Sequence, residues 1–288
     1  MQPNALPLSR TPSPRPGENN APARPTSLAS SNAQASSPSS LGEVQDTLDQ
    51  ASTLLYTSRP KEALLLLRTQ ANSPQAQRSF AFQWYLGQAY KSAVDELVAA
   101  NRLGAFLVTP DATGNWLNPT IRSERLTCYI GMIASYGRFL HILQDPSQSA
   151  RFIERNSEQD LTQKLFGART GMYHAQLEVR GLFNQLGQIN QNKASQAFVQ
   201  ESLANGRFTE EDDLVRSFRE VEADPLYHAV VDATAPINQA VQASGHIPQF
   251  VWHNLAQASM QKISQLPELE IARPFLLPWP ILPMMPLG

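Results

Sequence analysis

Apolar residues recur every three or four positions along most of the chain after residue 40, which is the period of an amphipathic α-helix. The first such run predicts a helix at the start of the folded region; its apolar positions are Leu41, Val44, Leu48, Ala51 and Leu55. The same period, interrupted by short loops, continues to about residue 270. The pattern therefore predicts a predominantly all-α protein with a single domain of about ten helices over residues 41–270.

Several helix starts can be placed where a capping residue stands just before a proline. Ser58 before Pro60 and Ser73 before Pro74 both have this form, because the hydroxyl can accept from a free amide and proline fits the first turn. Further boundaries are expected at Asp145-Pro146, the capping box Ser157 to Asp160, Asn205-Gly206, Thr209 to Asp212, Asp224-Pro225, Ala235-Pro236 and Pro248.

One helical stretch is apolar almost all round. It reads "SERLTCYIGMIASYGRFLHILQ" over residues 123–144, and such a helix is buried rather than exposed on one side. Gly131 and Gly137 lack a side chain, so another backbone can approach them closely. We expect this stretch to be the central helix of the fold.

The stretch 62–99 resembles part of a tetratricopeptide array. Leu86, Gly87, Tyr90 and Ala99 match the spacing of that repeat, and Ala63 stands one slightly long period earlier. No third unit follows, and repeat stacks normally need several units. We therefore interpret the stretch as a helical hairpin.

Residues 104–120, "GAFLVTPDATGNWLNPT", interrupt the helical pattern. They contain a short β-like run together with Pro110, Gly114 and Pro119, which predicts an irregular insertion with a possible strand pair. Trp116 lies in this insertion, where the chain's own core is hard to reach, so we expect it to contact another molecule.

Residues 1–40 are rich in Ser, Pro, Ala and Asn and have almost no large apolar side chains. Ordering them would cost conformational entropy without burial to offset it, so they are expected to form a disordered N-terminal arm. Arg10, Arg15 and Arg24 give this arm a small positive charge, and a weak or indirect contact with RNA phosphates is one expectation for it. A simple solvated tail is the other.

The C-terminal residues 271–288 are apolar and rich in proline. Proline fixes φ and has no amide hydrogen, so these residues predict an extended segment rather than a helix or a central strand. Such apolar surface requires a partner, and we expect the segment to act as an arm docked on a second molecule. The predicted interface residues are Trp116, Phe275, Leu276, Trp279, Ile281, Leu282 and Met284.

Composition narrows the functional class. The formal net charge of -2 and the lack of a dense block of Lys and Arg argue against tight electrostatic binding of nucleic acid. The one cysteine, Cys128, excludes an internal disulfide and a cysteine-rich zinc cluster, which favours a reducing compartment. The N-terminal residues contain no apolar core of a signal sequence and the apolar stretch 126–143 is broken by Arg138 and His141, so we expect neither a cleaved signal peptide nor a membrane span.

Two groups of residues could carry chemistry. His228 lies one helical turn from Asp224 and from Asp232, so the three could bind a divalent metal or tune a general base. The alternative is that Asp224 caps a helix and Asp232 lies on the surface. His174 and Glu178 form a similar pair one turn apart.

Common catalytic motifs are missing from the sequence. The acidic run at 209–213 lacks the ligand spacing of a calcium loop, and the sequence has no phosphate-binding glycine loop, HExxH or GxSxG motif. Cys128 falls in the apolar helix, where a thiol usually packs as a small hydrophobe. We therefore expect a non-enzymatic protein without a cofactor.

Two functional classes remain. The first is a viral coat subunit, of capsid or nucleocapsid-like type, that self-associates through its arms and is found in the virion or the host cytoplasm. The second is a helical protein–protein interaction module, such as a scaffold or a bacterial effector exported into a host cell through its unfolded leader. The apolar C-terminal arm favours the first class, and the tetratricopeptide-like hairpin suits the second.

Overall fold

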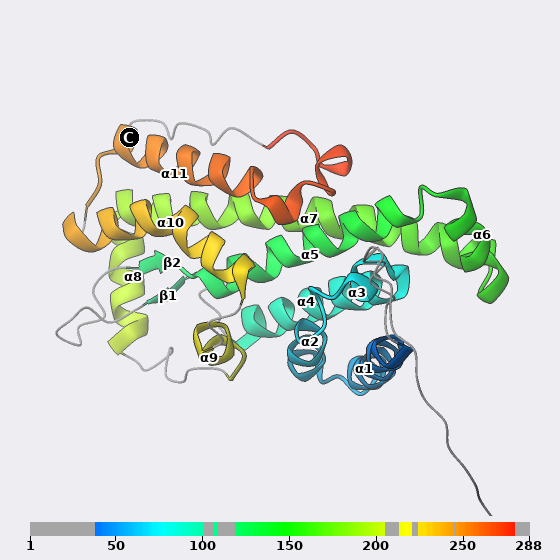
Figure 1. Ribbon diagram of the computed structural model, residues 1–288. Helices are drawn as coiled ribbons and strands as arrows, with labels where there is room; N and C mark the ends of the chain where they lie inside the picture. The colour runs from blue at the N-terminus through cyan, green and yellow to red at the C-terminus, as the bar shows by residue number, and fades with distance from the viewer. Residues whose placement is uncertain are drawn as a thin grey trace, which may run out of the picture. The chain divides into compact units, whose positions relative to one another are not determined.

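Helices account for most of the residues that the computed structural model describes, which are 38–100, 106–108, 119–204, 213–220, 224–244 and 246–279. Within these ranges the elements are, in chain order, α1 (Pro38–Tyr56), α2 (Pro60–Arg68), α3 (Pro74–Arg78), α4 (Phe80–Ala100), β1 (Phe106–Val108), β2 (Pro119–Ile121), α5 (Ser123–Ile142), α6 (Pro146–Arg155), α7 (Glu158–Gln191), α8 (Lys193–Ala204), α9 (Asp213–Glu220), α10 (Pro225–Ser244), α11 (Gln249–Ser264) and two 3-10 turns, η1 (Pro267–Leu269) and η2 (Arg273–Phe275) (Figure 1). The predicted all-α class is confirmed, with eleven described helices where about ten were expected.

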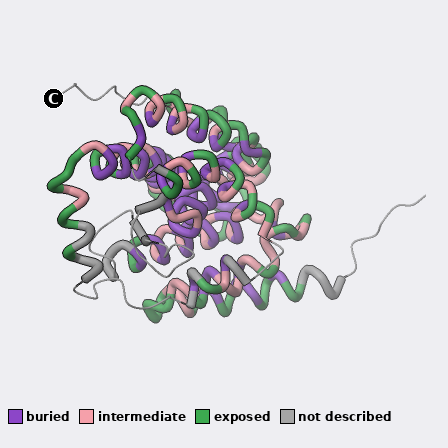
Figure 2. Tube along the Cα trace, turned by 90° about the vertical axis from the view of Figure 1, so that its left-hand side faces the viewer, coloured by how far each residue is buried: buried purple, intermediate pink, exposed green. Residues whose placement is uncertain are grey.

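Helix α5 is the centre of the fold. Fifteen of its twenty residues are buried, and it packs against α4, α7, α10 and η1. Figure 2 shows that buried positions gather where helices face one another, while their outer turns are exposed. The prediction of a central helix, apolar on all sides, is therefore confirmed.

Two glycines allow the close packing of α5. A β-carbon at Gly131 would lie 2.4 Å from the ring of Tyr90, and one at Gly137 would lie 2.6 Å from the Cα of Ala272. Real β-carbons do not approach other atoms so closely, so any larger residue at either position would have to displace Tyr90 or Ala272. The C-terminal segment reaches the core at Gly137, because Ala272 is fully buried there.

Most of the helix starts predicted in the described part of the chain are confirmed; those at Asn205-Gly206 and Thr209 to Asp212 lie outside it. The side chain of Ser73 accepts a hydrogen bond from the Ala76 amide, and those of Asp145 and Ser157 accept from Ser147 and Asp160. Each thus satisfies an amide that the first helical turn leaves free.

Ser58 is not the cap of α2, contrary to prediction. It has a left-handed φ of 58°, its amide donates to Leu55, and the amide of Arg59 donates to Leu54. This is the Schellman pattern, so Ser58 ends α1, and Arg59 stands at the start of α2.

Pro236 does not end a helix either, since α10 continues through it. Pro236 is exposed, so the carbonyl that loses its usual donor can bond to water.

The short strands lie where the β-like insertion was expected. β1 and β2 pair antiparallel, with Phe106 opposite Ile121 and Val108 opposite Pro119. The side-chain amide of Asn238 on α10 bonds both backbone groups of Ile121, at 3.0 and 3.1 Å. The strand pair is thereby fixed to the helical core.

The hairpin expected in 62–99 consists of α2 and α4, which pack against each other, with the short α3 between them. Gly87 on α4 lies beneath the Tyr136 ring, because a β-carbon there would be 2.5 Å from the ring. Gly87, which matches the tetratricopeptide spacing, therefore allows the close contact between α4 and α5.

A glycine exchange at the α5 contact should test this packing. Gly137→Ala forces Ala272 and its backbone to move, and we expect it to lower the free energy of unfolding by about 1–3 kcal/mol in urea denaturation. Gly181→Ala on α7 is the matched control, because no atom lies within 4 Å of its added β-carbon. That variant should be as stable as the wild type or gain up to about 1 kcal/mol. Equal stability of both variants would contradict the packing argument.

Candidate functional site

The C-terminal segment begins on the chain's own core. η1 and η2 carry it across α5, and extended backbone starts at Leu276, with φ -80° and ψ 144°. Phe275, Leu276 and Trp279 are partly buried and pack against the core. Three of the predicted interface residues thus contact their own chain, which the sequence did not predict.

The other predicted interface residues lie outside the described residues; they are Trp116, Ile281, Leu282 and Met284. The same holds for Arg10, Arg15 and Arg24 of the predicted N-terminal arm. Their contacts with another molecule stay predictions.

Gln176 on α7 fixes the C-terminal segment in place. Its Nε2 donates to the carbonyl of Leu277 at 3.1 Å, and its Oε1 accepts from the Leu277 amide at 3.3 Å. Gln176 is only 4% exposed, so the pair of bonds satisfies a buried amide that would otherwise be costly. Sequence reasoning missed this anchor; the available signal was a glutamine on the buried face of an amphipathic helix.

The outer face of α7 carries an exposed apolar stripe next to this anchor. Phe166, Tyr173 and Leu177 are 72%, 47% and 42% exposed. Their spacing of seven and four residues puts them on one face of the helix. We call these three residues the α7 stripe.

The α7 stripe lies opposite the face that packs into the protein. Ala168, Ala175 and Val179 on that inner face are fully buried. A helix with apolar residues on two opposite faces is typical of one covered on both. Leu277, whose backbone is bonded to Gln176 on the same helix, is 51% exposed and adds apolar surface near α7.

Asp224 has a structural role. Its carboxylate caps α10 by accepting from the Tyr227 amide at 3.2 Å, and its second oxygen pairs with the Arg68 guanidinium at 2.5 Å. The guanidinium also lies 4.0 Å over the ring of Phe218. This nearly buried pair joins α2 to α9 and α10.

The predicted group of Asp224, His228 and Asp232 does not come together as a metal site. His228 and Asp232 are exposed on α10, and the His228 ring lies beside Tyr227. Nowhere in the described part of the chain do three His, Cys, Asp or Glu side chains form a group that could hold a metal ion.

His174 and Glu178 do form the predicted pair, with Nε2 and Oε1 3.6 Å apart. Glu178 also accepts a hydrogen bond of 3.3 Å from the Tyr129 hydroxyl and lies 3.9 Å from Arg125. Burial raises the pKa of Tyr129 to about 12, so the hydroxyl stays a donor at neutral pH. Glu178, through Tyr129 and Arg125, therefore ties α7 to α5.

Comparison of the chain with protein-family models, with curated proteins and with solved structures finds no match. Among the described helices, none is both long and apolar enough to cross a membrane. The argument for function therefore depends on the surface formed by the α7 stripe and the C-terminal segment.

Removal of the anchor should release the C-terminal segment. Gln176→Ala loses both hydrogen bonds to Leu277, and we expect a loss of about 1–3 kcal/mol of stability and faster proteolytic cleavage after residue 270. Gln188→Ala is the control, because Gln188 is exposed on the same helix. Limited proteolysis followed by mass spectrometry would locate the cuts. Unchanged cleavage in Gln176→Ala would show that the anchor is dispensable.

Cys128 should be chemically inert in the folded protein. It is fully buried, and burial raises the pKa of its thiol to about 12, which suppresses the reactive thiolate. We expect almost no reaction with a maleimide at neutral pH until denaturant is added, followed by complete labelling. Rapid labelling of the native protein would reopen a nucleophilic role for this residue.

Proposed function

We propose that the protein is a non-enzymatic structural subunit that self-associates, of the coat or nucleocapsid-like class. In this proposal the α7 stripe is covered by residues 280–288 of a second copy. The observation that carries it is the exposed apolar stripe, which lies opposite the buried face of α7, the helix to which the C-terminal segment is anchored.

The sequence of residues 280–288, "PILPMMPLG", suits the stripe chemically. It has no charged side chain and carries five large apolar residues. The stripe is flanked on the outer face of α7 by Arg169 and Arg180. Pairing that face with its own copy would bring like charges together, whereas an uncharged apolar segment avoids this cost.

The length of the segment also fits. Nine residues in a polyproline-like conformation reach about 28 Å, since each contributes about 3.1 Å. Phe166 and Leu177 are about 16 Å apart along the helix axis at about 1.5 Å per residue. Three prolines in this stretch limit the entropy lost when it docks.

The stripe should control assembly. Burying Phe166 fully is worth about 1.5–3 kcal/mol, so Phe166→Ser should weaken association by about tenfold to a hundredfold. Size-exclusion chromatography with light scattering should show oligomers for the wild type and smaller species for the variant. Tyr56→Ser is the control, because Tyr56 is an aromatic residue 90% exposed on α1.

Deletion of 280–288 should have the same effect as Phe166→Ser without lowering the melting temperature. A wild-type chain that is monomeric at the highest soluble concentration would overturn the proposal. That result would favour the second class, a helical interaction module.

Cross-linking separates an exchanged segment from one that folds back. In a Leu177→Cys/Leu282→Cys double variant, oxidation should give species of twice the chain mass on a non-reducing gel. The native thiol at Cys128 is buried and should not interfere. Formation of the monomer-mass intramolecular disulfide alone would show that each chain covers its own stripe, which contradicts arm exchange.

A further inference from the structure

A cavity lined by both apolar and charged side chains lies between α2, α4, α5, the start of α10 and η1, away from the α7 stripe. Its volume is about 410 Å³. Sites for small molecules typically fall between roughly 300 and 1,000 Å³, so the cavity can admit a ligand of amino-acid size.

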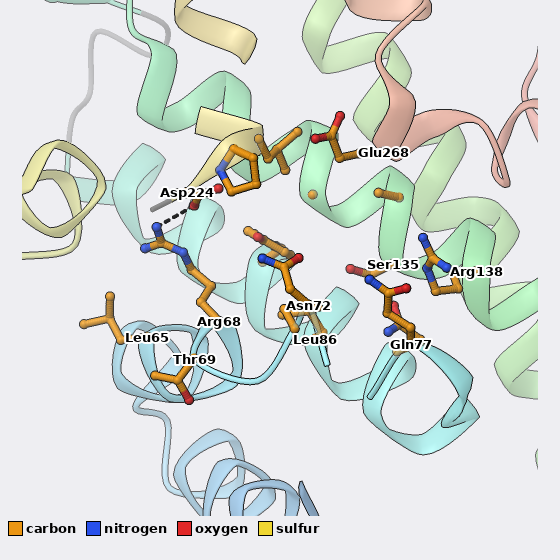
Figure 3. A pocket seen from close by; sticks show the side chains of 17 residues that line it. Leu65, Arg68, Thr69, Asn72, Gln77, Leu86, Ser135, Arg138, Asp224 and Glu268 are labelled. Atoms are coloured by element: carbon orange, nitrogen blue, oxygen red, sulfur yellow. Dashed lines mark hydrogen bonds and ion pairs between the residues drawn. The ribbon is translucent and has the colours of Figure 1, made fainter. Parts of the chain in front are cut away.

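The charged groups around the cavity are one ion pair and two further side chains that are not paired with each other. Arg68 and Asp224 are joined by their ion pair on one side, and Figure 3 shows Glu268 and Arg138 apart from that pair. The Oε2 of Glu268 is buried and has no hydrogen-bond partner in the described structure.

Arg138 is the complementary group. Its guanidinium makes no ion pair or side-chain hydrogen bond with any described residue, and partial burial lowers its pKa from the usual value. No ion pair joins it to Glu268, although both line the same cavity. The buried Glu268 oxygen is thus left without a partner, which is costly, and the half-buried Arg138 guanidinium is not paired with any described carboxylate.

The remaining lining includes an apolar surface. Leu65, Leu86 and Leu226 contribute aliphatic side chains, and Tyr90 contributes its ring. Gly131 leaves room for that ring against α5. An aliphatic group of a ligand could therefore be buried against these side chains.

We infer that this cavity binds a small zwitterion with an aliphatic side chain, as in a free α-amino acid. The ligand's carboxylate pairs with Arg138, and its ammonium group donates to Glu268. This arrangement satisfies both groups with charge-assisted hydrogen bonds. It does not depend on the proposed assembly.

Three related probes test this inference by calorimetric titration of the full chain. L-leucine carries both charged groups, 4-methylpentanoate lacks the ammonium, and 3-methylbutylamine lacks the carboxylate. We expect L-leucine to bind at least about tenfold more tightly than either of the other probes. Undetectable binding of L-leucine, or equal affinity for all three, would overturn the inference.

Two variants test which protein side chain binds which charged group of the ligand. In Glu268→Gln, L-leucine should bind no more tightly than 4-methylpentanoate, because the partner of the ammonium group is lost. In Arg138→Met, L-leucine should bind no more tightly than 3-methylbutylamine, because the partner of the carboxylate is lost. Glu270→Gln is the matched control, because Glu270 is an exposed carboxylate two residues from Glu268. Circular dichroism would establish that each variant is folded. Unchanged preferences in both cavity variants would show that the ligand binds elsewhere.

Discussion

The burial of α5 on nearly every side is the constraint from which the rest of the fold follows. A helix that is apolar all round cannot be covered by one neighbour, so α4, α7, α10 and the C-terminal turns each cover a different side of α5. Close approach on two of these sides requires Gly131 and Gly137. The C-terminal segment is therefore held on the core at Ala272, and its contacts with its own chain continue to Trp279, so the proposed arm can begin only after that residue.

Local signals in the sequence predicted much of this architecture. Ser73, Asp145 and Ser157 each mark a helix start because capping involves residues only two or three positions apart. The same reasoning failed at Ser58, which lies between the end of α1 and the start of α2. Its amide and that of Arg59 bond to carbonyls of α1, so Ser58 ends α1 and does not cap α2.

Contacts between residues distant in sequence could not be predicted in this way. Arg68 and Asp224 are 156 positions apart, and Gln176 and Leu277 are 101 apart. Nothing in the local pattern around any of these residues identifies its partner. The Asp224 and His228 spacing suggested a metal site for this reason, since the true partner of the carboxylate lies on α2. The apolar tail was recognised, but its first contacts are with its own chain.

The C-terminal segment connects the two candidate sites physically. The contact of Ala272 with Gly137 holds the segment on α5, so that Glu268 faces the cavity and Leu277 reaches Gln176 beside the α7 stripe. A displacement of this segment would remove a carboxylate from the cavity and the anchor from the arm together. Glu268 lies before Ala272 and the anchored Leu277 lies after it, so the contact of Ala272 with α5 helps to position both the cavity carboxylate and the residues from which the proposed arm continues.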